Sequence, residues 1–177
     1  YNRAFSSGEN VMLILKTNKV SGSDGNFVES IKSEIISARR GISNFPEIFI
    51  INKKISNDQI SYLHKMCDVY VSPYRGEGWG MPIVQAAKNK NGIITTGLGG
   101  FSEMLNESSA IFIDHKMLNV KNMSWSGNLY TADQRWAEPN EDSLVKSLKY
   151  AYNNRKIISE MGIEANKISD SISIDKV

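Results

Sequence analysis

The chain has 177 residues, of which 41% are hydrophobic and 23% are charged, and its formal net charge at pH 7 is +2. This length and composition suit one globular domain with a proper core. The small net charge and the scattered basic residues give no field that would attract nucleic acid, so we expect no nucleic acid partner. No apolar run approaches the ~20 residues that a membrane-spanning helix needs.

The single cysteine, Cys67, excludes an internal disulfide framework and suits a reducing compartment, so we expect a cytoplasmic protein. The apolar neighbours of Cys67 favour a place in the core over a nucleophilic role. The sequence opens with YNRAFSS and shows neither an initial Met nor a signal-peptide pattern. We interpret it as a chain cut out of a longer protein.

Strand and helix patterns alternate along the chain. The expected strands, which are short, apolar and β-branched, are 11–16, 47–52, 68–74, 92–96 and, as the last one, 109–114. The expected helices are 27–40, a helix that a capping box opens at 56–59 and that runs to about 66, 81–88, a short one at 101–106, 141–154 and roughly 156–168. A polar loop is expected at 21–26 and a long loop at 115–135, where no clear period appears.

Short buried strands that alternate with helices indicate an α/β fold, a Rossmann-like parallel sheet with helices on both faces. Ligands of such sheets bind beyond the carboxyl ends of the strands. Two flexible turns, 75–80 and 97–100, follow the third and fourth expected strands and should lie at this edge.

The most informative stretch is the first of these turns with the helix behind it, RGEGWGMPIVQAA (75–87). Gly76, Gly78 and Gly80 surround an acidic residue, Glu77, and Pro82 stands in the first turn of the helix, where its missing N–H costs nothing. A strand, a glycine-rich turn and a helix N-terminus together make an anion site, because backbone can approach a ligand and free N–H groups favour phosphate. The alternative is three glycines that only make a tight turn.

The run Gly-Glu-Gly-Trp-Gly-Met-Pro (76–82) resembles the donor-binding loop of retaining GT-B glycosyltransferases of glycosyltransferase family 4, the Glu-x7-Glu group. Glu77 fills the first acidic position, whereas Gln85 stands at the second, which is a departure in charge but not in shape. Three longer segments resemble the family's segments in the same order: 55–82, 91–105 and 136–155.

The resemblance implies that residues 1–177 are a single nucleotide-sugar-binding domain, the C-terminal half of a GT-B fold. The first strand of this domain and the acceptor-binding N-terminal domain would lie upstream of Tyr1, so this fragment alone is expected to be inactive. The implied activity is transfer of a hexose from a nucleotide diphosphate sugar to a glycan or lipid acceptor. No cofactor and no metal are implied, and neither His64 nor His115 has further ligands at metal-binding spacing.

The resemblance also assigns roles in the turn. Glu77 would lie near the transferred sugar and stabilise positive charge at its anomeric carbon, the alternative being an acid that caps the following helix. The backbone N–H groups expected to bind donor sugar and phosphate are those of Gly78, Trp79, Gly80 and Met81. Trp79 itself is expected to pack beneath the loop. Arg75 either reaches a phosphate or is solvated.

Two further groups of residues complete the expected site. Gln85, off the apolar stripe of its helix, would bind the ribose with one acceptor and one donor, and Ile55 would lie near the nucleobase. Gly99, Gly100 and Glu103 resemble a donor-proximal element of the family, although Glu103 has the alternative of capping its helix.

Two other functions remain open at this point. One is a non-catalytic glycosyltransferase-like module that binds or scaffolds a partner, for which the loss of charge at Gln85 is the best support. The other is a different GT-B nucleotide-sugar enzyme, such as an epimerase.

Overall fold

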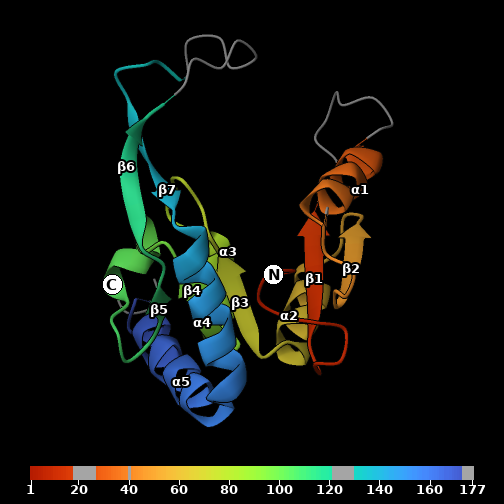
Figure 1. Cartoon of the computed structure of the whole chain (residues 1–177). Helices are drawn as coiled ribbons and strands as arrows, with labels where there is room; N and C mark the ends of the chain where they lie inside the picture. The colour runs from red at the N-terminus through yellow and green to blue at the C-terminus, as the bar shows by residue number, and fades with distance from the viewer. Residues whose placement is uncertain (18–26, 40, 121–129, 173–177) are drawn as a thin grey trace. The chain divides into compact units, whose positions relative to one another are not determined.

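The structure, a computed structural model, describes residues 1–17, 27–39, 41–120 and 130–172. The chain divides into two compact units, residues 1–57 and 58–177, and each is described here by itself (Figure 1). The loop expected at 21–26 lies outside the described residues.

The first unit contains a parallel pair of strands and one helix. Strand β1 (Met12–Thr17) pairs with β2 (Glu47–Asn52) along its whole length, from Met12 opposite Glu47 to Thr17 opposite Asn52. Helix α1 (Phe27–Ala38) connects them. The apolar stripe expected on this helix is only half-buried, and Ala38 at its end is exposed.

The second unit is built on a parallel sheet whose strands follow the order β3-β4-β5. These strands are Val69–Ser72, Gly92–Thr95 and Ile111–Phe112. The α-helices of this unit are α2 (Asn57–Met66), α3 (Met81–Lys88), α4 (Glu141–Asn153) and α5 (Arg155–Ser171), and η1 (Gly100–Met104) is a 3₁₀ helix. The expected short helix after β4 is therefore this 3₁₀ turn, and the expected α/β class with a parallel sheet is confirmed.

The central strand β4 shows why both faces of this sheet are covered. Ile93 packs with the buried side chains of α3 on one face, whereas Ile94 packs with Ala151 of α4 on the other face. Helix α5 contributes to both cores, through Ala165 on the first face and Ile158 on the second. Because successive strand residues point to opposite faces, a strand buried on both sides needs an unbroken apolar run, which residues 92–94 provide.

Residues 115–139 differ from the expectation. Instead of one long loop, the structure has an antiparallel pair, β6 (His115–Asn119) and β7 (Arg135–Pro139), with Met117 opposite Ala137 (Figure 1). The prediction that 109–114 is the last strand was therefore wrong. All five residues of β6 are exposed, so no apolar alternation marked it in the sequence.

A buried amide, Asn91, ties helix α2 to the start of β4. The Asn91 Nδ2 group donates to the carbonyl oxygens of His64, at 2.8 Å, and of Cys67. The Asn91 Oδ1 atom lies 2.9 Å from Nδ1 of His64. Since Nδ2 is the donor end of this amide, Oδ1 accepts and the imidazole donates from Nδ1. Burial raises the pKa of the Cys67 thiol, which fits a residue of the packed interior rather than a nucleophile.

Helix α5 crosses the turn before β4 at a glycine, and this contact gives a first prediction. A Cβ added at Gly162 would lie 2.2 Å from the carbonyl oxygen of Lys90, a backbone atom that has no room to yield. We expect Gly162→Ala to lower the free energy of unfolding by about 2 kcal/mol, measured by urea denaturation. Gly76→Ala, in the same unit and with nothing within 4 Å of the added atom, is the control. Equal stabilities of the two variants would contradict the close packing.

The imidazole of His64 gives a second prediction. Burial lowers the pKa of His64, and the hydrogen bond with Asn91 opposes the shift. The unfolded chain therefore binds the proton more readily, so the stability from neutral His64 is present above about pH 6.5 and is lost as the pH falls below that value. We expect the melting temperature to drop between about pH 7.5 and about pH 5.5.

His64→Gln should flatten this dependence, measured by thermal unfolding at each pH. His115→Gln is the control, because His115 is exposed on β6, and it should leave the slope unchanged. A slope that persists in His64→Gln would assign it to another group.

Candidate functional site

Two turns meet beyond the carboxyl ends of β3 and β4. The first runs from Pro73 to Gly80 and leads into α3, and the second runs from Thr96 to Gly99 and leads into η1. Because β3 and β4 are parallel neighbours, with Ser72 opposite Thr95, their following turns leave the same edge of the sheet.

The backbones of the two turns lie against each other. Gly100 has a φ of +57°, and a Cβ there would come within 2.1 Å of the carbonyl oxygen of Gly78. A Cβ at Gly99 would lie 2.9 Å from the carbonyl oxygen of Glu77. The N–H of Phe101 donates to the carbonyl oxygen of Trp79 at 2.9 Å. Side-chain-free residues are therefore required here, and the structure brings the two expected turns together.

Tyr74 connects the two turns through its hydroxyl and its carbonyl. The hydroxyl lies 2.6 Å from Oγ of Ser102 and accepts the N–H of Leu98 at 3.2 Å. Because Oγ of Ser102 donates to the carbonyl oxygen of Gly99, Tyr74 is the donor to Ser102. Thr96 Oγ1 donates to the carbonyl oxygen of Tyr74 at 2.9 Å. Sequence reasoning missed this cluster, although a tyrosine at the end of a buried strand signals a need for a hydroxyl partner.

The N-terminus of α3 presents free backbone donors. Gly80, in the left-handed region at φ 79°, begins the helix, and its carbonyl oxygen accepts the N–H groups of Ile83 and Val84. No described residue accepts a hydrogen bond from the N–H of Trp79, Gly80 or Met81. These groups, together with the dipole of the helix, suit an anion.

Glu77 stands exposed at the opening of the turn. One of its carboxylate oxygens, Oε1, accepts the N–H of Gly78 at 3.0 Å. The second oxygen has no partner among the described residues. The carboxylate is thus held beside the free N–H groups of the turn while it remains open to a ligand.

Trp79 does not pack beneath the loop as expected. Its side chain is 46% exposed, and its ring leans on that of Phe101 with centroids 6.4 Å apart. Phe101 fills the space under the turn and is itself 1% exposed. The apolar support is therefore supplied by η1, which leaves one side of the Trp79 ring open to solvent.

The other expected residues lie in different settings. Glu103 accepts the N–H of Gly99 at 2.8 Å, so it caps η1, which was the alternative interpretation of this residue. Gln85 is half-buried on α3 between buried neighbours, and its side chain has no hydrogen-bond partner among the described residues. Ile55 belongs to the first unit, where it is half-buried after β2.

Arg75 is engaged by the strand β7. Its Nε and one terminal nitrogen lie 2.6 Å and 2.9 Å from the two carboxylate oxygens of Glu138. The guanidinium also lies over the ring of Trp136, 4.9 Å from its centroid. Neither expected setting of Arg75, a phosphate contact or free solvation, is what the structure places there.

The described residues contain no group of three or more His, Cys, Asp or Glu side chains arranged to hold a metal ion. Among the described helices, none is both long enough and apolar enough to cross a membrane.

Comparison with known families decides what this site belongs to. The model of the family described as glycosyl transferases group 1 matches residues 44–167, which include both turns and all of the three-stranded sheet. The chain belongs to this family. None of the curated proteins matches the sequence.

Two solved structures share the fold of this glycosyltransferase domain. Sucrose-phosphate synthase from Thermosynechococcus elongatus aligns with a TM-score of 0.66 and 12% identity over 90% of this chain and 34% of that protein. HepE from Anabaena, solved in complex with UDP, aligns with a TM-score of 0.61 and 14% identity over 91% of this chain and 36% of that protein. The chain thus spans about a third of either protein, and these matches show the GT-B fold expected from the sequence.

The contact between the two turns gives a third prediction. Gly100→Ala adds a left-handed strain and a clash with backbone, so we expect it to lower the free energy of unfolding by about 3 kcal/mol. Gly41→Ala is the matched control, because Gly41 has a φ of +76° with nothing within 4 Å of the added atom. That variant should lose about 1 kcal/mol, from strain alone. Equal losses in urea denaturation would show that the turns do not pack on one another.

Proposed function

We propose that this chain is the donor-binding domain of a retaining glycosyltransferase of family 4, which transfers a hexose from a nucleotide diphosphate sugar to a glycan or lipid acceptor. The observation that carries the proposal is the glycine-rich turn at the N-terminus of α3. It combines three unoccupied N–H groups, those of Trp79, Gly80 and Met81, with the carboxylate of Glu77.

The diphosphate would rest on this turn. The N–H groups of Trp79, Gly80 and Met81 would donate to phosphate oxygens, and the positive end of α3 would stabilise their charge. The N–H of Gly78 joins them once the carboxylate of Glu77 turns away from it. Backbone donors suffice to bind the leaving diphosphate, so the proposal needs no metal ion and no cofactor.

Glu77 would act on the transferred sugar. A retained configuration at the anomeric carbon passes through a transition state with oxocarbenium character, and a nearby carboxylate stabilises the positive charge that develops there. The exposure of Glu77 leaves it accessible to a sugar, and the adjoining Gly76 and Gly78 leave space for the sugar ring.

Gln85 would bind the ribose. An amide pairs with a diol through one acceptor and one donor, and the half-buried Gln85 side chain has no described partner that competes for these bonds. Ile55 is kept as a contact of the nucleobase. Gly99, Gly100 and Glu103 support the donor turn, the first two by close backbone packing and Glu103 by capping η1.

The complete enzyme would add an acceptor-binding domain that closes over the bound donor. UDP is the nucleotide to test first, because HepE was solved with it. The free thiol of Cys67 fits a cytoplasmic location. A second function, a binding module without catalysis, is favoured by Gln85 alone, which removes a charge from the ribose site.

The first test titrates UDP onto the chain by calorimetry. We expect binding at millimolar concentration or better. Gln85→Glu should strengthen it about fivefold, because a carboxylate makes charge-assisted bonds to the ribose hydroxyls. Gln134→Glu, exposed near β7, is the control for added charge and should leave the affinity unchanged. Absence of binding by UDP and GDP at millimolar concentration would overturn the donor-site assignment.

The second test separates an enzyme from a binding module. In the complete protein with its acceptor-binding domain, Glu77→Gln should lower the rate of donor hydrolysis by about 100-fold or more, with UDP affinity nearly unchanged. Glu107→Gln, an exposed acid beyond η1, is the control and should hydrolyse donor at the parental rate. UDP binding without any hydrolysis in the parent protein would support the module instead.

A further inference from the structure

The donor turn is joined to β7 through the main chain. The N–H of Ala137 donates to the carbonyl oxygen of Arg75 at 2.9 Å, and Ala137 is 0% exposed. Arg75 therefore stands beside β7 as an added partner at the edge of the β6–β7 pair. The position of the turn depends on a pair of strands that lies almost 60 residues further along the chain.

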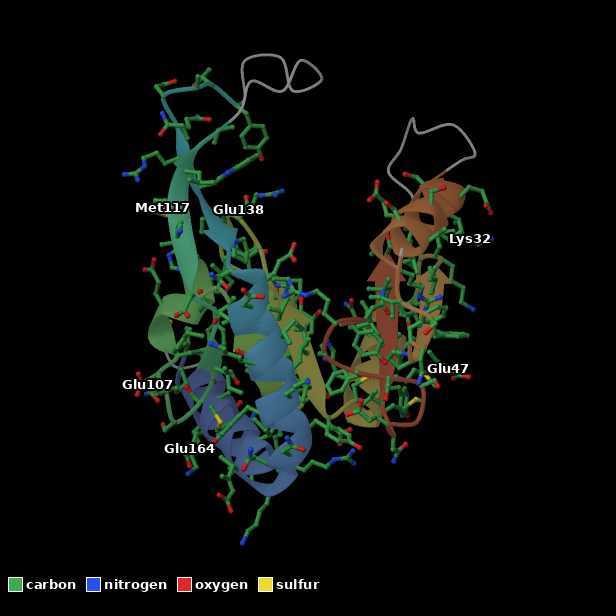
Figure 2. The ribbon with its side chains drawn as sticks, in the orientation of Figure 1. Lys32, Glu47, Glu107, Met117, Glu138 and Glu164 are labelled. Carbon is green, nitrogen blue, oxygen red and sulfur yellow. The ribbon has the colours of Figure 1, made fainter. Side chains whose placement is uncertain are left out.

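The side chain of Arg75 strengthens the same junction. Both of its contacts with Glu138 are short, and both oxygens of that carboxylate are used (Figure 2). The ring of Trp136 lies below the guanidinium on the same strand. The hydrogen bonds with Glu138 raise the pKa of Arg75 further above its usual value. A two-point pair with stacking fixes direction as well as distance, which a lysine does not reproduce.

We propose that Arg75 is a positioning residue of the donor site, which holds the glycine-rich turn against β7 through Glu138 and Trp136 and does not contact the donor phosphates. The inference rests on the proposed function, since it concerns the same turn. It extends the site to the β6–β7 pair, which would support the turn from outside the sheet. Glu138 then contributes to nucleotide binding although it is an acid near an anion site.

This last consequence separates the proposal from a direct phosphate contact. If Arg75 contacted phosphate, removal of Glu138 would release the guanidinium and remove a repelling charge, so UDP would bind equally well or more tightly. If Arg75 positions the turn, removal of Glu138 weakens UDP binding as much as removal of Arg75 does. The two alternatives predict opposite signs for the same variant.

The experiment measures UDP affinity by calorimetry for Arg75→Gln, Arg75→Lys, Glu138→Gln and the double variant Arg75→Gln with Glu138→Gln. We expect each single variant to bind about three- to tenfold more weakly and the double variant no more weakly than either. Lys116→Gln is the control, because Lys116 lies opposite Glu138 in the strand pair and is exposed. Unchanged or tighter binding by Glu138→Gln, or parental affinity in Arg75→Lys, would overturn the proposal.

Hydrogen exchange of the backbone amides of residues 76–81, measured without nucleotide, tests the same junction independently of the donor. Exchange should accelerate in Arg75→Gln and in Glu138→Gln but not in Lys116→Gln. Exchange unchanged in the first two variants would overturn the positioning role. Accelerated exchange in a chain that binds no UDP would instead retain the junction and refute the proposed function.

Discussion

The close approach of two backbone turns is the constraint on which the candidate site depends. Gly100 lies so near the carbonyl oxygens of Gly78 and Trp79 that no side chain fits between them. This contact allows the N–H of Phe101 to reach the carbonyl oxygen of Trp79. With their carbonyl groups held toward the second turn, the residues of the first turn present their N–H groups on the open side. A glycine pair in one loop thus shapes the donor surface of another.

The positive field of the site arises from backbone rather than from side chains. Arg75, the basic residue nearest the glycines in sequence, is paired with Glu138, and Gln85 carries no charge. What remains for an anion are the N–H groups at the start of α3 and the dipole of that helix. Such donors are fixed by the fold and need no reorganisation when a ligand arrives, which is the property that stabilises charge during a reaction.

The β6–β7 pair gives the domain a second support for this surface. Two strands alone are marginally stable in water, so the pair needs contacts with the rest of its unit. Ala137 and Glu138 supply them at Arg75, directly before the glycines. A segment without a hydrophobic face of its own is therefore coupled to the turn that the fold presents to a ligand.

The sequence by itself determined the class of the fold and the location of the turn. Residues 92–94 are apolar without interruption, which is the pattern of a strand covered on both faces, and the helix after Pro82 began where expected. These features are local, because chain periodicity and the special backbone of glycine and proline act over a few residues.

Only the tertiary structure decided the partners of individual side chains. Arg75 and Glu138 are 63 positions apart, and no local pattern relates them. Likewise, Tyr74 finds Ser102, Trp79 stays half-exposed because Phe101 already fills the space below it, and β6 forms without an apolar face. Each outcome depends on which distant segments the sheet brings together, and that information lies in the packing rather than in any short stretch of the chain.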